Sequence, residues 1–325
     1  MRQAMASAEV ADDLLDGDPT TRKLQDRVAE MLGKERALFF PTGTMANQAA
    51  VWLQAPRGTE LLADPDSHLM RREVAATAAL CGVQARAILA LRADQPAAQF
   101  EIAVERELTT PSPSRTSLVS LENTHNGAGG VVLPLEAARG AAKAAERHGV
   151  PVHLDGARLW NAAVALAVTP AALASSAASV MVAFDKGLGA PAGSVLAGPA
   201  GLIEEARRVR RRFGGTMRQT GILAAAGLYG LEHHFADLAR DHDHARLLAA
   251  GLQGTPGLRV TPPQTNIVMI DLDPPRDAAE IARRARAGGV LILVWTATRL
   301  RMVVHRDVDR AGISVAVDAI ARSCQ

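Results

Sequence analysis

The sequence of 325 residues is poor in cysteine, in aromatic side chains and in net charge. Its two cysteines, Cys81 and Cys324, show no CxxC or zinc-ligand spacing, which excludes a disulfide scaffold and favours a reducing, cytoplasmic compartment. The formal net charge is only +2, so no overall field attracts nucleic acid or an anionic membrane. The 48% hydrophobic fraction is that of a soluble globular chain and excludes disorder.

Long apolar segments are also scarce. Within residues 1–18, Glu9, Asp12, Asp13 and Asp16 stand where a signal peptide needs an apolar run. Leu159–Phe184 contains no charge, but it is built from Ala, Ser and Val with Asn161 and Pro170 inside it. We therefore interpret it as two buried units and expect no membrane span.

What the chain does contain is an alternation of short apolar runs with helical patterns. The runs are continuous rather than alternating, which favours an α/β fold whose mostly parallel sheet is covered on both faces. We predict strands at 37–40, 60–63, 83–89, 117–121, 151–154, 179–184 and 193–197, and helices from about residue 45 and over 135–147.

Three parts follow from this pattern. Residues 1–210 form a large α/β domain, 211–250 are connecting helices, and 251–325 form a smaller α+β domain. In the last part we predict strands at 258–260, 267–272, 291–294 and 299–304, and helices at 277–286 and about 308–322. In open α/β sheets, ligands bind at the carboxyl ends of the strands.

Two polar residues follow predicted strands at that edge. Lys186 comes directly after an apolar strand, where burial would lower the pKa of its amine and suit it to Schiff-base chemistry. Asp155 ends an earlier strand, 31 residues before. This pair matches a pyridoxal phosphate site, in which the lysine forms an imine and the carboxylate keeps the pyridine nitrogen protonated. A loop lysine and a helix-capping aspartate are the alternative interpretation.

A seat for the phosphate is available in Thr42-Gly43-Thr44, a turn followed by a helix whose free N–H groups would favour an anion. His68 follows the second strand and can place an imidazole over a ring. His125 follows the fourth strand. Each of these histidines can equally be an ordinary surface or core residue.

Seven stretches, in order, span nearly the whole chain and resemble the low-specificity L-threonine aldolases of the β-eliminating lyase group. The resemblance implies an aspartate-aminotransferase-like fold of fold type I, pyridoxal 5'-phosphate as cofactor and a homo-oligomer, dimer or tetramer, with shared sites. The stretches are ALFFPTGTMANQ, SHLMRRE, LENTHN, HLDGARLWNAAVAL, DKGLGAPAGSVLAG, GGTMRQTGILAAAGLYGLEH and LRMVVH.

The resemblance also implies roles for individual residues. Lys186 carries the cofactor, Asp155 pairs with its ring nitrogen, and His68 stacks on the ring. The phosphate region is served by Gly43, Thr44 and Arg218, with Arg218 reaching a neighbouring chain's site. Arg158 and Arg301 bind the substrate carboxylate, and His125 lies near the substrate hydroxyl. Either His68 or His125 is the base that takes the hydroxyl proton.

The sequence departs from the family pattern at three places. A segment similar to DLRSDTVTRP normally precedes the MRQAM stretch, and we expect a misassigned start codon. The residue before the lysine is usually serine but is Asp185 here, which would raise the pKa of Lys186 and repel the cofactor phosphate. Leu15 occupies the place of a family tyrosine, so substrate preference or rate is expected to differ.

Two clusters of charged or titratable residues could suggest nucleic-acid or metal binding, but simpler interpretations are favoured. The basic run Arg207–Arg212 follows Glu204 and Glu205 on one predicted helix, which favours a helix surface or subunit contact over nucleic acid. The histidines between His233 and His244 fit no zinc spacing, so we expect a solvated helix end and no metal.

The predicted activity is retro-aldol cleavage of L-threonine, L-allo-threonine or another β-hydroxy-α-amino acid to glycine and an aldehyde. Two alternatives remain open: a related pyridoxal phosphate lyase for another β-substituted amino acid, and a catalytically silent homologue that binds the cofactor. The expected partner is the amino acid substrate, with neither nucleic acid nor membrane.

Overall fold

The computed structural model describes residues 1–15 and 17–324, and it divides into two compact units. The first comprises Met1–Ala128 and Val132–Phe235, and the second comprises Gly129–Val131 and Ala236–Gln325. The division falls within the predicted connecting helices. Of these, α10 (Gly221–His233) belongs to the first unit and α11 (Leu238–Leu252) to the second.

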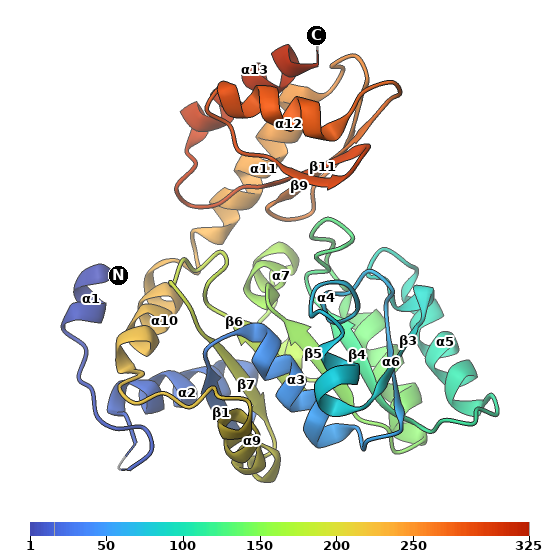
Figure 1. Cartoon of the computed structure of the whole chain (residues 1–325), viewed down its shortest axis with the longest axis vertical. Helices are drawn as coiled ribbons and strands as arrows, with labels where there is room; N and C mark the ends of the chain where they lie inside the picture. The colour runs from blue at the N-terminus through green and yellow to red at the C-terminus, as the bar shows by residue number, and fades with distance from the viewer. Residues whose placement is uncertain (16, 325) are drawn as a thin grey trace. The chain divides into compact units, whose positions relative to one another are not determined.

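The first unit is built on a seven-stranded sheet with the order β1-β7-β6-β5-β4-β2-β3 (Figure 1). Strand β7 runs antiparallel to both neighbours, and every other pairing is parallel. The prediction of a mostly parallel α/β sheet is therefore confirmed. The strands are β1 (Arg36–Phe40), β2 (Glu60–Ala63), β3 (Gln84–Ala87), β4 (Thr116–Glu122), β5 (Val152–Gly156), β6 (Ser179–Ala183) and β7 (Ser194–Gly198).

Helices cover this sheet, and their ends follow local sequence signals. At the start of α2 (Pro19–Leu32), Asp18 accepts a hydrogen bond from the Thr21 backbone N–H at 2.8 Å, and Gly33 ends the helix with φ 62°. The other helical segments are α1 (Arg2–Ala6), α3 (Gly43–Gln54), α4 (His68–Arg71), η1 (Thr77–Cys81), η2 (Leu89–Leu91), α5 (Ala97–Thr109), α6 (Leu135–Arg147), α7 (Leu159–Leu166), α8 (Pro170–Ala174) and α9 (Ala200–Arg212).

The centre of the sheet is buried on both faces. All seven residues of β4 and all five residues of β5 and of β6 are buried. Helix α3 packs on β6 and β7 and against α9, with Met181, Leu196 and Phe40 among the buried side chains of this layer. In a sheet covered on both faces, a ligand-binding site is expected among the loops at the carboxyl ends of the strands.

The charge-free stretch Leu159–Phe184 consists of the short helices α7 and α8 followed by strand β6. The expected two buried units are thus three elements, and residues 165–167 at the end of α7 are exposed. Within the described part of the chain, no helix has both the length and the apolar character needed to cross a membrane.

The second unit is a four-stranded antiparallel sheet with the order β10-β11-β9-β8 and three helices. Its core joins Leu248 and Leu252 of α11 to Val268 and Ile270 of β9. The predicted small α+β architecture is confirmed for this part. Its remaining elements are β8 (Leu258–Thr261), β9 (Ile267–Leu272), α12 (Ala278–Ala287), β10 (Leu293–Thr296), β11 (Arg299–Val303) and α13 (Arg310–Ser323).

Candidate active site

Three neighbouring strands end side by side in the middle of the large sheet. Glu122, the last residue of β4, stands opposite Asp155 of β5, and Asp155 stands opposite Met181 of β6. Lys186 follows β6 by three residues. Parallel strands share one carboxyl edge, so the loops after β4, β5 and β6 all emerge there. The structure thus places Asp155 and Lys186 after adjacent strands.

The carboxylate of Asp155 is buried, with only 3% of the residue exposed, and two hydrogen bonds hold it. Its Oδ1 accepts a hydrogen bond from the Ala157 backbone N–H at 3.0 Å. Its Oδ2 accepts one from the side-chain amide of Asn47 at 2.8 Å. The two donors fix the direction of the carboxyl plane.

Lys186 departs from the expectation that it is buried. Its side chain is 39% exposed, and its Nζ lies 3.1 Å from both carboxylate oxygens of Asp185. The strand ends at Ala183, and a turn closed by the Ala190 N–H to Phe184 C=O bond carries the lysine out of the sheet. The prediction that this amine is buried is therefore wrong, since solvent reaches it.

His68 begins the short helix α4, and its side chain is 35% exposed. Its backbone N–H donates to Glu122 Oε2 at 2.6 Å, and its Nδ1 lies 2.9 Å from Glu73 Oε1. Partial burial lowers the pKa of the imidazole, but the carboxylates of Glu73, Asp155 and Glu122 outweigh it and raise this pKa overall.

Glu122 is the central buried carboxyl of this edge. Besides the His68 backbone, it accepts a hydrogen bond from the Asn126 N–H at 2.8 Å. Burial and the neighbouring charge of Asp155 raise the pKa of Glu122, while His125 and the two backbone donors oppose that shift. The carboxyl thus ties the loops after β2 and β4 together.

His125 is 1% exposed and engaged at both ring nitrogens. Its Nδ1 accepts a hydrogen bond from the Ala128 N–H at 3.1 Å, and its Nε2 lies 3.0 Å from Asp64 Oδ1. Burial lowers the pKa of His125, but Glu122 and Asp64 raise it by more. In this structure the ring is part of a buried ion pair that joins two loops.

The expected phosphate seat is the first turn of α3, which begins at Gly43. The Thr42 hydroxyl accepts a hydrogen bond from the Met45 N–H at 3.2 Å and so caps this helix. A Cβ on Gly43 would lie 3.2 Å from Met181 Cε, so glycine allows the close packing of the turn on β6. The N-terminus of α3 and Thr44 fit an anion through the helix dipole.

The three predicted arginines occupy different environments. Arg158 is half-buried and donates to Asn126 Oδ1 at 3.2 Å. Burial lowers its pKa against the opposing charges of Glu122, Asp155 and Asp185. Arg218 is 58% exposed and pairs with Asp12 at 2.7 Å. Arg301 belongs to β11 of the second unit, is 8% exposed and lies over the Trp295 ring at 5.4 Å.

Several functional side chains were missed by the sequence analysis, although they stand inside the quoted motifs. Asn47 and Gln48 are buried amides within the apolar helix α3, and both donate to Glu73. His153 precedes Asp155 on the same strand and contacts Asn47. The available signal was the presence of adjacent polar residues in an otherwise apolar helix, which requires buried partners.

One group of side chains could hold a metal ion by its chemistry alone. His68, Glu73 and Asp155 each offer an atom, and these atoms lie within 4.8 Å of one another. The amide nitrogen of Asn47, however, donates to both carboxylates. A hydrogen-bond donor already occupies the position between the charges, so this arrangement serves an organic cofactor better than a cation.

The other charged groups have structural roles. On α9, Arg207 and Arg208 pair with Glu204 and Glu205 one turn earlier, and Arg210 is buried against Asp13. The expected solvated helix end is wrong for His234 and His242, which are buried. His234 Nδ1 lies 2.8 Å from the Leu188 carbonyl, and His244 Nδ1 lies 3.0 Å from the Val308 carbonyl.

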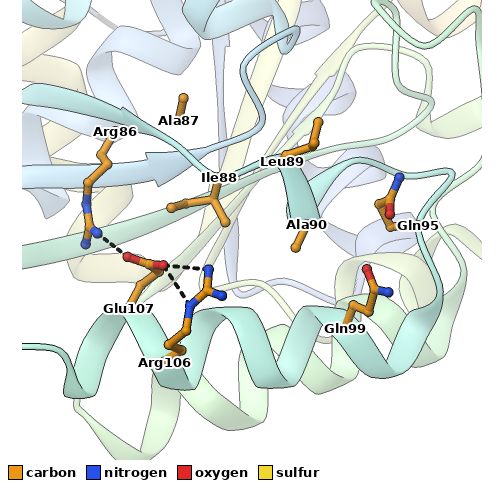
Figure 2. Close-up of a pocket in the computed structure, with 9 residues that line it drawn as sticks. All are labelled: Arg86, Ala87, Ile88, Leu89, Ala90, Gln95, Gln99, Arg106 and Glu107. Atoms are coloured by element: carbon orange, nitrogen blue, oxygen red, sulfur yellow. Dashed lines mark hydrogen bonds and ion pairs between the residues drawn. The ribbon is translucent and has the colours of Figure 1, made fainter.

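A surface cavity of about 440 Å³ lies beside strand β3 (Figure 2). Within it, Arg86 and Arg106 both form ion pairs with Glu107 of α5, so its charged side chains are engaged with one another. It contains neither Asp155 nor Lys186 and is lined by Arg86, Ala87, Ile88, Leu89, Ala90, Gln95, Gln99, Arg106 and Glu107. The strand-end cluster, rather than this cavity, has the chemistry of an active site.

The fold is that of fold-type I enzymes. A candidate aromatic amino acid β-eliminating lyase/threonine aldolase from Exiguobacterium sp. 255-15 superposes with a TM-score of 0.83 at 24% identity, over 99% of this chain and 92% of that one. The family model described as beta-eliminating lyase matches residues 1–274. The chain belongs to this family.

Curated relatives are similar over almost the whole length. Low-specificity L-threonine aldolase 1 of Arabidopsis thaliana is 38% identical over 322 residues, covering 96% of this chain and 89% of the relative. The low specificity L-threonine aldolase of Escherichia coli (strain K12) is 38% identical over 310 residues, covering 95% and 91%. The resemblance drawn from the sequence motifs is thereby confirmed.

Proposed function

We propose that the protein is a pyridoxal phosphate-dependent aldolase that cleaves L-threonine, L-allo-threonine or related β-hydroxy-α-amino acids to glycine and an aldehyde. The observation that carries this proposal is the placement of Asp155 and Lys186 after adjacent parallel strands, with His68 beside them. Family membership and two threonine aldolases at 38% identity support it.

The residues at the sheet edge fit this cofactor. Asp155 is buried, aimed by two N–H donors and free of basic side-chain partners among its hydrogen bonds, which suits a protonated ring nitrogen. The α3 N-terminus with Gly43 and Thr44 suits the phosphate. Lys186 supplies an accessible amine for covalent attachment. When bound, pyridoxal phosphate supplies an electron-accepting ring for the electrons released at the substrate Cα.

The remaining residues bind the substrate and move its proton. A guanidinium can bind a carboxylate through bidentate hydrogen bonds, which orients the substrate bond to be broken. We assign this role to Arg158, and to Arg301 as the family resemblance implies. His68 or His125 takes the β-hydroxyl proton. Of the two, His68 is the more exposed, whereas both His125 nitrogens have protein partners. Glu122 accepts hydrogen bonds from the backbone N–H groups of His68 and Asn126, and the Asn126 side chain in turn accepts a hydrogen bond from Arg158.

The assembly and compartment belong to the same proposal. We propose a homo-oligomer, dimer or tetramer, in which Arg218 serves the phosphate of a neighbouring site, supported by its exposure and by its pairing with only Asp12 among the ion pairs of the described residues. Free Cys81 and Cys324 agree with a cytoplasmic protein that contributes to glycine formation. Light scattering of the purified protein checks the oligomeric state.

The activity is tested by incubating the purified protein with pyridoxal phosphate and, separately, L-threonine, L-allo-threonine and a phenylserine. Glycine and the matching aldehyde are measured in each reaction. We expect equimolar glycine and aldehyde from at least one substrate. Products from only the phenylserine would select the related lyase, and cofactor binding without glycine formation from any substrate would identify a silent homologue and contradict the proposed aldolase.

A further inference from the structure

A single buried amide, that of Asn47, connects three polar groups at the centre of the site. The residue lies on α3 and is 1% exposed. Its Nδ2 donates to Asp155 Oδ2 at 2.8 Å and to Glu73 Oε1 at 2.9 Å. Its Oδ1 lies 3.0 Å from His153 Nε2. All the hydrogen-bonding capacity of the amide nitrogen is therefore used on two carboxylates.

The direction of these hydrogen bonds follows from chemistry. Carboxylates accept only, so both amide hydrogens of Asn47 point at them and its oxygen faces His153. The Nε2 of His153 must then carry a hydrogen, and its Nδ1 accepts from the Ser179 hydroxyl at 2.8 Å. Complete burial lowers the pKa of His153 to about 4, which keeps this ring neutral. The protonation of His153 thus fixes which end of the Asn47 amide faces the two carboxylates.

The two carboxylates that share Asn47 stand close together. Ligand atoms of Glu73, Asp155 and His68 all lie within 4.8 Å of one another. Two like charges at such a distance repel each other unless a hydrogen-bond donor lies between them. Glu73 receives further donors from Gln48 Nε2 at 2.6 Å and from His68 Nδ1 at 2.9 Å.

We propose that Asn47 is a positioning residue that holds the carboxylates of Asp155 and Glu73 at a set separation, so that the partner of the cofactor ring nitrogen and the His68 imidazole form one rigid unit. The part of this inference that concerns the cofactor rests on the proposed function. Without the amide, Asp155 keeps the Ala157 N–H but loses the donor that it shares with Glu73. The carboxylate that faces the ring nitrogen is then less firmly oriented.

The matched pair Asn47→Leu and Gln48→Leu tests this role. Both residues are buried amides on α3, and both donate to Glu73, but only Asn47 reaches Asp155. The dissociation constant of pyridoxal phosphate from the full-length apoprotein is measured by equilibrium dialysis. Removing a hydrogen bond to a charged group weakens binding roughly tenfold or more, so we expect at least that loss for Asn47→Leu and less than about threefold for Gln48→Leu.

A second readout needs no cofactor. The His68 titration midpoint is followed by NMR of the apoprotein labelled at histidine. The negative charges of Glu73 and Asp155 raise the pKa of His68. Without their common donor these like charges move apart, so Asn47→Leu should lower the His68 midpoint. Gln48→Leu leaves that common donor in place and should lower the midpoint less. Asn47→Ser provides the same comparison should the leucine variant fail to fold.

An unchanged His68 midpoint in the Asn47 variant, or a dissociation constant equal to that of the native protein, would overturn the positioning role. Failure of the native protein to bind pyridoxal phosphate would instead overturn the proposed function. In that case the apoprotein titration decides the role of Asn47 by itself.

Discussion

Glu122 and Asp155 stand opposite each other in the register of two parallel strands, and both are buried at the carboxyl edge of the sheet. They differ in their partners. Asp155 accepts hydrogen bonds from the Asn47 amide and the Ala157 backbone N–H, whereas Glu122 accepts them from the backbone N–H groups of His68 and Asn126. Asp155 is therefore the proposed partner of the ligand, and Glu122 holds the surrounding loops together.

The first prediction concerns this loop-building carboxyl. In Glu122→Gln, the new amide nitrogen faces a backbone N–H, so one donor that Glu122 satisfied becomes unpaired. Since Asn126 contacts Arg158, we expect kcat/KM for the amino acid substrate to fall about tenfold, mainly through KM. Steady-state kinetics check this, with the exposed Glu136→Gln as control. Unchanged kinetics would contradict the role.

The second prediction concerns covalent attachment. Lys186→Ala removes the accessible amine at the carboxyl edge, so borohydride reduction of the protein with pyridoxal phosphate should no longer label the peptide containing residue 186. Turnover should be abolished, because the variant has lost the group that is proposed to carry the cofactor. Mass spectrometry of the digested protein checks the labelling, and Lys143→Ala, an exposed lysine on α6, is the control. Retained turnover in Lys186→Ala would refute the assignment.

The third prediction concerns the unusual carboxylate beside that lysine. Asp185→Ser frees the Lys186 amine from its 3.1 Å ion pair and removes a negative charge near a phosphorylated ligand. The pair is more than a third exposed, so its interaction is screened and is worth about 1 kcal/mol at most. We expect pyridoxal phosphate to bind up to about fivefold more tightly, measured by dialysis against native protein. Weaker binding would show that Asp185 helps to hold the cofactor.

The fourth prediction concerns acid stability. The pKa of His153 is lowered by burial from 6.5 to about 4, so below pH 6.5 the unfolded chain takes up a proton that the folded chain refuses. This stabilising contribution is present above pH 6.5 and is lost as the pH falls. Between pH 7 and 5, the free energy of unfolding of the native protein should drop about 2 kcal/mol more than that of His153→Gln.

Urea unfolding at the two pH values checks this difference. The raised pKa values of His68 and His125 act in the opposite sense, because their contribution is complete below pH 6.5 and is lost as the pH rises through their folded-state values. Both histidines are present in the two proteins, so their effects largely cancel in the comparison. Equal pH dependence of the native protein and the variant would rule out a neutral buried His153.

Much of the fold was accessible from sequence because its signals are local. Continuous apolar runs marked the strands of the parallel sheet, and helix α6 and strand β9 have the predicted bounds. Larger differences were at 83–89, where β3 ends at Ala87 and the turn η2 follows, and at 291–294, where β10 is displaced to 293–296. A short apolar run does not reveal where it stops pairing with its neighbour.

The sequence by itself determined the family, the order of strands along the chain and the motifs that carry Asp155, His68 and Lys186, because these depend on residue type and spacing. Only the tertiary structure decided the partners. Asn47 meets Glu73 across 26 residues and Asp155 across 108, and His125 meets Asp64 across the β2–β4 pair. Such contacts, like the exposure of Lys186, depend on where strands end and chains turn, which residue spacing does not encode.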